Sequence, residues 1–325
     1  MYDKLFVINL PLSPWMQTDE SKIKSKLVEF SEKESLNHRL VERGAKIVAV
    51  NEGRVAFQMP RGNLEGIYPK IIMIDQVQKH ISNRHYSLAF QAVRTHKLDF
   101  NLITDIDPQL FRTDIQNVLT DIKRVDFINL LISQISETLS SELQYILPSK
   151  TYDSLLADFE MVGKGKKVKE ICRLISTTLR EVNREEYILS IFTAEIREGR
   201  VSDVLFEIKE MKKEEVEVIV SPHIVTGMEY PYAGQKKKKK QTAQQILEFV
   251  CWLVDPNAIY EAALLTYDLE LAAITARCTQ KDPKEYIPYF ESLRNIQDQV
   301  DFRTTICLDL KKYDIAVKEL SEGNN

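Results

Sequence analysis

Glycine is scarce in this chain, with only 10 glycines among 325 residues. Enzymes that cradle phosphates or expose a nucleophile on sharp turns use several glycine-rich loops, so this scarcity disfavours such enzymes. The sequence also has no GxSxG, HExxH or CxxC pattern, the spacings that would indicate a serine nucleophile or a metal site. We therefore predict no catalytic, cofactor-binding or metal-binding residues, no cofactor, and a protein that is not an enzyme.

Cysteines and long apolar runs are also few. The four cysteines are far apart, and each lies within or beside an apolar helical pattern: Cys172, Cys251, Cys278 and Cys307. We expect them to be reduced, buried thiols of an intracellular protein. A helix needs about 18 or more apolar residues to cross a bilayer, and no such run occurs. The first residues carry charges before a short apolar run, which does not fit a signal peptide. We expect no membrane contact.

The chain has no excess of one charge. Its 44 Lys and Arg stand against 48 Asp and Glu, a net charge of -4. Proteins that bind nucleic acid over a whole surface carry a general positive field, so any contact with RNA here must be local. The five histidines do not stand at metal-ligand spacing from any cysteine.

Residues 1–65 carry strand signals. Leu5 to Ile8 predict one short strand, and residues 20–35 predict an exposed helix or a loop. Apolar residues at 47–50 and alternating residues at 55–59 flank a glycine-containing turn, which predicts a β-hairpin. An isolated hairpin is marginal in water, so this one is expected to belong to a larger sheet, part of which lies outside the chain.

Residues 66–325 predict helices almost throughout. Two apolar stripes at helical spacing, at residues 71–81 and 86–93, predict a helical hairpin with Asn83 at its turn. Further helices are predicted from Asp107-Pro108 through Leu119, from residue 187 to residue 197, and from Leu308 to Leu320 at the end of the chain.

The stretch from Thr242 to Leu293 reads as four short helices, two of which begin at Asp-Pro pairs, Asp255-Pro256 and Asp282-Pro283. Such short helices must stack on neighbours. The predicted fold class is mainly α, an irregular alpha-solenoid of tetratricopeptide-like helical hairpins preceded by a short β segment. No fixed repeat period is present. Trp252 is expected to be a packing residue.

A candidate contact lies in an expected flexible insertion at residues 214–241. It holds five consecutive lysines, Lys236, Lys237, Lys238, Lys239 and Lys240. These lysines could contact RNA or a partner, but few aromatic residues accompany them to stack on bases, which favours a solvated loop. Gly163 to Lys167 lacks the spacing of a phosphate-binding loop and predicts a flexible basic loop.

Several segments resemble the largest subunit of the Elongator complex, the IKAP family. Residues 60–65, after the strand at 56–59, resemble the junction at which the second β-propeller of that family passes into its helical region. Residues 125–130, 249–271 and 312–317 are also similar to this family, and the segment from Gln280 to Phe290 is the most specific match. The resemblance covers roughly residues 37–325, and residues 1–36 are not part of it. The predicted domains are a β segment at 1–65 that resembles the edge of a propeller and a helical solenoid at 66–325, whose lysine-bearing insertion is peculiar to this chain.

The resemblance implies a non-catalytic scaffold in the complex that modifies wobble uridines of tRNA at carbon 5. The implied partners are the other Elongator subunits, including the catalytic subunit with radical-SAM and acetyl-transfer domains, and tRNA through the complex. The family protein is a homodimer, but its dimerisation region is absent here. The implied location is the cytoplasm and also the nucleus. Two alternatives stay open: a coat-type or trafficking solenoid, and an enzyme with an unrecognised helical active site.

Overall fold

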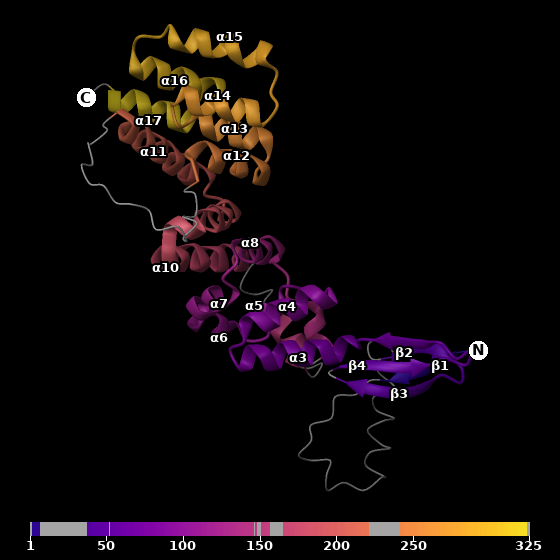
Figure 1. The fold of residues 1–325 in the computed structure, drawn as a ribbon. Helices are drawn as coiled ribbons and strands as arrows, with labels where there is room; N and C mark the ends of the chain where they lie inside the picture. Colours follow the sequence, from indigo (N-terminus) through magenta and orange to yellow (C-terminus); the bar gives the residue numbers. More distant parts are fainter. Residues whose placement is uncertain are drawn as a thin grey trace, which may run out of the picture. The chain divides into compact units, whose positions relative to one another are not determined.

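The computed structural model describes residues 2–6, 38–51, 53–145, 147, 151–156, 165–220 and 241–323. The chain divides into two compact units, residues 1–168 and 169–325. Figure 1 shows strands and then helices along the first unit, and helices throughout the second. The change from strands to helices falls between residues 67 and 70, inside the first unit. The predicted domain boundary near residue 65 itself stays a prediction.

The β segment forms two small antiparallel sheets. One sheet pairs β1 (Tyr2–Phe6) with β2 (His38–Glu42), so the predicted first strand exists but lies earlier than residues 5–8. The other sheet has the order β3 (Lys46–Asn51), β4 (Arg54–Gln58) and β5 (Leu64–Ile67). The predicted hairpin of β3 and β4 is confirmed.

Strand β5 was not predicted. Its sequence is only Leu-Glu-Gly-Ile, too short and too poor in β-branched residues to show a strand pattern. It forms because residues 59–63 close a turn in which Met59 N–H bonds to Asn63 O at 2.8 Å. The predicted helix or loop at residues 20–35 lies outside the described residues.

The helices of the first unit pack around a shared apolar core. Every residue of the two predicted stripes on its first helical hairpin is buried, and Asn83 lies at the turn between them, as predicted. Phe90 stacks on Phe127 with ring centroids 4.9 Å apart. The helices are α3 (Lys70–Ser82), α4 (Tyr86–His96), α5 (Leu102–Asp105), α6 (Pro108–Thr113), α7 (Ile115–Ile122) and α8 (Val125–Gln134), followed by the 3-10 helix η1 (Ser141–Tyr145).

The second unit is a stack of helices. These are α10 (Lys167–Glu198), α11 (Val201–Val220), α12 (Ala243–Leu253), α13 (Pro256–Leu264), α14 (Leu269–Cys278), α15 (Pro283–Arg294), α16 (Gln299–Asp309) and α17 (Tyr313–Gly323). Helix α11 packs on α12, α13 on α14, α14 on α15 and α16 on α17, and α12 also packs on α14 while α11 also packs on α13. This layering confirms the predicted mainly helical, solenoid fold.

Local capping explains where these helices begin. The Asp255 carboxylate accepts from Asn257 and Ala258 N–H, and the Asp282 carboxylate accepts from Lys284 N–H. Thr242 and Gln245 form a reciprocal capping box at the start of α12. Each of these side chains satisfies backbone donors that lack a partner within the helix, which confirms the predicted starts at residues 242, 255 and 282.

The long helix α10 is two helices joined at a kink. Asn183 has extended backbone angles, φ -168° and ψ 93°. Its side-chain oxygen accepts from Glu186 N–H at 3.2 Å, so Asn183 caps the second half in the manner of an N-cap residue. This kink agrees with the separate helix predicted from residue 187.

Four sequence expectations are corrected. Helix α11 continues to Val220, so the predicted insertion cannot begin at residue 214. The single helix predicted from Pro108 through Leu119 is broken at Asp114, and the closing helix predicted from Leu308 is divided between α16 and α17. Trp252 is 88% exposed and therefore does not pack in the core. Among the described helices, none combines the length and the apolar character needed to cross a bilayer.

Candidate interaction surfaces

The contact residues predicted from the sequence lie outside the part of the chain that the structure describes. The lysines Lys236 to Lys240 lie outside the described residues. Within the described ranges, His, Cys, Asp and Glu do not gather in any group able to hold a metal ion. All four cysteines are free; Cys172, Cys251 and Cys307 are buried and Cys278 is half-buried. Burial raises the pKa of Cys251 to about 12, which suppresses the thiolate and makes this thiol unreactive.

Lys167 does not belong to a flexible loop. Its ammonium lies 2.8 Å from Asp105 Oδ1 and also donates to Asn101 Oδ1 and to the Thr138 carbonyl. The side chains of Lys167 and Asp105 are only 8% and 3% exposed. The prediction of a flexible basic loop through residue 167 is therefore wrong at this position, because Lys167 is the first residue of a helix and its side chain is paired with Asp105 within the first unit.

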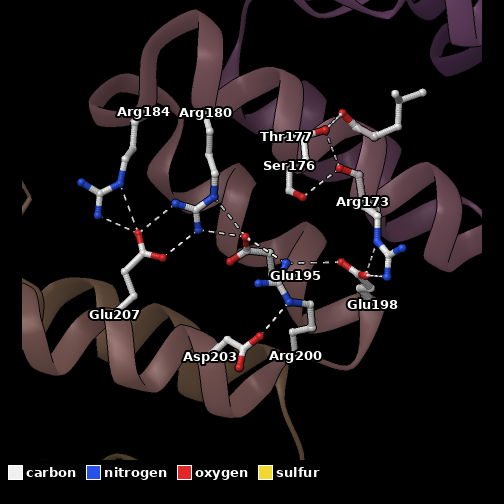
Figure 2. A network of polar contacts seen from close by, with 11 residues as sticks. Arg173, Ser176, Thr177, Arg180, Arg184, Glu195, Glu198, Arg200, Asp203 and Glu207 are labelled. Atoms are coloured by element: carbon white, nitrogen blue, oxygen red, sulfur yellow. Dashed lines mark hydrogen bonds and ion pairs between the residues drawn. The ribbon is translucent and has the colours of Figure 1, made fainter.

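A network of arginines and carboxylates joins both halves of α10 to α11 (Figure 2). Arg180, in the first half of α10, donates to Glu195 Oε1 in the second half at 2.8 Å. The same guanidinium makes a bidentate contact with Glu207 of α11, at 3.1 and 2.7 Å. Arg184 adds a further bond to Glu207 at 2.6 Å. Arg180 thus holds three helical segments at one point.

A second set of ion pairs lies beside it (Figure 2). Arg173 Nη2 lies 2.7 Å from Glu198 Oε1, and Arg200 Nε lies 2.8 Å from Asp203 Oδ2. Within the described residues, the buried Oε2 atoms of Glu195 and Glu198 have no hydrogen-bond partner. The three cavities described below do not have Glu195 or Glu198 in their linings. We call this network of ion pairs the internal clamp.

Burial and pairing move the pKa values of this network in opposite directions. Burial of Glu195 raises its carboxyl pKa above the usual value, and the Arg180 and Arg200 charges offset this only in part. Burial would also raise the pKa of Glu207, but hydrogen bonds from Arg180 and Arg184 outweigh it and hold the pKa below the usual range. Glu207 is therefore kept ionised, which suits a structural ion pair.

A cavity of about 400 Å³ opens in the second unit. Its walls come from three places: Phe206 and Lys209 on α11, the turn between α13 and α14, and the start of α16. Lys209 Nζ donates to the Thr266 carbonyl at 2.6 Å. The remaining lining residues are Tyr267, Gln299, Phe302 and Arg303. We call this space the α11–α16 cavity.

The first unit carries two cavities of about 520 and 490 Å³ that share Glu65, Gly66 and Tyr68. They lie against the small sheet, whose strand β3 is exposed along its whole length. Ile47, Val48 and Val50 are each more than half exposed, at 55%, 51% and 64%. An apolar strand at a sheet edge is a surface on which another strand or chain can pair. The larger sheet expected from the sequence stays a prediction.

The comparison with protein families identifies a match to the family described as ELP1 alpha-solenoid over residues 70–293. The chain belongs to this family. Helices α3 to α14 and all of α15 but its last residue lie within the matched range, so the family match covers most of the observed helices.

Several proteins that are similar to this chain are named Elongator complex protein 1. The chain is 32% identical over 291 residues to Elongator complex protein 1 of Schizosaccharomyces pombe, which covers 88% of this chain and 21% of the relative. It is 29% identical over 294 residues to Elongator complex protein 1 of Saccharomyces cerevisiae, and 28% identical over 287 residues to that of Rattus norvegicus. The chain thus spans about a fifth of the length of these relatives. The resemblance stated from residues 249–271 and 280–290 to this family is confirmed.

Proposed function

We propose that this chain is part of a non-catalytic scaffold subunit of the Elongator complex, which supports modification of tRNA wobble uridines at carbon 5. The observation that carries the proposal is membership of the ELP1 alpha-solenoid family over residues 70–293, on a chain that folds as a stack of helices. Stacked helices present extended surfaces and hold bound partners at fixed positions. The proposed role is to position other subunits, while bond-making belongs to the partner with radical-SAM and acetyl-transfer domains.

The internal clamp supports this role. A scaffold must transmit geometry between neighbouring helices, and the Arg180 contacts to Glu195 and Glu207 fix α10 against α11. Exposed apolar side chains supply contact surface: Trp252 at the end of α12, and Tyr313 and Val317 on α17, are 88%, 60% and 64% exposed. Exposed aromatic residues are enriched where proteins bind proteins. The proposed location is the cytoplasm and also the nucleus.

Gentle purification of the tagged full gene product from its own cells tests the proposal. We expect the Elongator catalytic subunit and its companions to copurify, with tRNA recovered only together with them. Copurification of coat or vesicle proteins instead would show a trafficking solenoid. A cofactor bound to the isolated 325-residue chain would contradict the non-catalytic role.

A further inference from the structure

We propose that the α11–α16 cavity binds a short peptide segment of a partner protein, in which an aromatic or large aliphatic side chain stands next to an Asp or Glu. The inference rests on the proposed function, because it names the chemistry of a partner that the scaffold would hold. All of its lining residues belong to the second unit.

The cavity has the size and lining of a side-chain pocket. Its volume of about 400 Å³ falls within the range of roughly 300 to 1,000 Å³ that is common for ligand pockets. Phe206 belongs to its lining and has 45% of its surface exposed, and Phe302 contributes a second ring. An incoming apolar side chain would cover Phe206, and burial of apolar surface contributes about 25 cal/mol per Å².

The charge of Lys209 determines which kind of residue can stand next to that apolar side chain in the peptide. Lys209 Nζ is held by a neutral acceptor, the Thr266 carbonyl, so this bond leaves its positive charge uncompensated. An ammonium has three donors, and the Thr266 bond uses one. Arg303, the other cation of the lining, is paired with Glu319 at 3.2 Å. Among the described residues, Lys209 has no ion-pair partner, so the lining offers its positive charge beside the rings of Phe206 and Phe302. This combination matches one carboxylate beside one apolar side chain.

The same surroundings disfavour RNA as the occupant. A nucleic-acid backbone brings a row of phosphates and needs several cations along its path. Next to Lys209 on α11, Lys212 is already paired with Glu270 at 2.6 Å and Lys213 with Glu210 at 2.7 Å. Since these lysines and Arg303 already have carboxylate partners, a phosphate backbone would lack the row of cations that it needs, whereas a single acidic side chain needs only Lys209.

The walls of the cavity are held before any partner binds. Tyr267 adopts a left-handed backbone with φ 56°, and its hydroxyl donates to Glu319 Oε1 at 3.0 Å. The Arg303 guanidinium lies over the Tyr267 ring, 5.2 Å from the centroid. Side chains fixed in this way lose little entropy when a ligand binds.

Short overlapping synthetic peptides that cover the proteins copurifying with the tagged gene product provide the test. Their binding to the full 325-residue chain is measured by fluorescence anisotropy, with Phe206→Ala and Lys209→Met as cavity variants. Tyr313→Ala and Lys213→Met are the matched controls, because they remove an exposed aromatic ring on α17 and an exposed cation on α11 outside the cavity lining. The thermal midpoint of each variant is recorded beside the affinity.

We expect the bound peptides to share an apolar residue next to an acid, and each cavity variant to weaken them about tenfold or more, while the controls leave affinity unchanged. Replacing the peptide's acid with its amide should weaken binding to the wild-type chain but have little further effect on Lys209→Met. This last comparison on the wild-type chain holds even if a cavity variant unfolds.

Three results would overturn the inference: no peptide binds, the cavity variants and the amide peptide bind as tightly as their parents, or the cavity variants weaken binding of tRNA and of no peptide. If Elongator subunits copurify and one of these results is found, only the cavity assignment fails. If Elongator subunits do not copurify, the proposed function fails by itself, whatever the peptides show.

Discussion

Arg180 and Glu207 face each other in a two-bond contact, with Nη1 to Oε1 at 3.1 Å and Nη2 to Oε2 at 2.7 Å. This geometry is the strongest form of an arginine–carboxylate pair, since two parallel bonds fix both groups. Because the same guanidinium also bonds to Glu195, one side chain sets the arrangement of both halves of α10 and of α11. The proposal that the second unit acts as a scaffold depends on this fixed packing of α10 and α11.

Arg180→Ala should destabilise the second unit by about 2 to 4 kcal/mol, because it leaves the Glu195 carboxylate, only 2% exposed, without its principal cation. This loss of stability lies toward the lower part of the range for buried ion pairs, because Arg180 itself is 30% exposed. Arg184→Ala is the matched control and should cost less than about 1 kcal/mol, because Arg184 is 48% exposed. Chemical denaturation of both variants measures the difference in unfolding free energy. Equal losses of stability would show that Arg180 does not hold α10 and α11 together more than Arg184 does.

The depressed pKa of Glu207 gives a pH test. A carboxyl whose pKa is lowered on folding contributes stability that is present above its unfolded value, here 4.5, and is lost as pH falls through the folded value. The gap in unfolding free energy between wild type and Glu207→Gln should therefore be constant near neutral pH and shrink below about pH 4.5.

Glu195 should behave in the opposite sense, because burial raises its pKa. Protonation of this carboxyl favours the folded state, so Glu195→Gln should be most costly at low pH relative to the wild type and least costly near neutral pH. Denaturation curves across the acid range for both Gln variants show whether the two slopes differ in sign. Parallel slopes would contradict the assignment of these two environments.

Lys167→Met should destabilise the first unit by about 3 to 5 kcal/mol, since it strands the Asp105 carboxylate, 3% exposed, beside groups that satisfy it only in part. Lys169→Met removes the same charge from an exposed position on the same helix and should change stability by less than about 0.5 kcal/mol. Thermal melting of the two variants provides the comparison. A small effect of Lys167→Met would mean that water replaces the ammonium.

Asp282→Ala should cost about 1 kcal/mol, the usual contribution of an N-cap carboxylate, because its oxygen accepts from Lys284 N–H at 2.9 Å. Lys284→Ala keeps that backbone bond and serves as the control. Hydrogen exchange at the first turn of α15 should accelerate in Asp282→Ala alone. Unchanged exchange would show that Pro283 alone sets the start of the helix.

Helix starts could be predicted from the sequence because they depend on neighbouring residues. Asp255 and Asp282 accept hydrogen bonds from backbone groups two or three residues away. The Asp-Pro pairs are therefore enough to predict where these two helices begin. The buried face of the first hairpin was predictable for a similar reason, since helical spacing alone groups its apolar residues. The Gln280 to Phe290 segment added the family, which no periodicity provides.

Exposure and long-range pairing could not be predicted in the same way. Trp252 lies two residues after the buried Val250, which turns it about 200° around the helix and away from the core. Its large apolar side chain suggests a buried position, but its place on the helix puts it on the exposed side. Arg180 and Glu207 are 27 residues apart, and nothing in either local pattern connects them. The α11–α16 cavity combines residues from 206 to 303, so only the folded chain shows it.

Nucleoside analysis of tRNA measures the proposed role in the Elongator complex. The gene that encodes this chain is deleted in its own organism, and tRNA is digested and measured by mass spectrometry, with and without a plasmid-borne copy. We expect loss of the carbon 5 side chains of wobble uridines, restored by the wild-type copy and restored less by a copy with Arg180→Ala. Wobble uridines that keep their full carbon 5 modification after deletion would contradict the role in the Elongator complex.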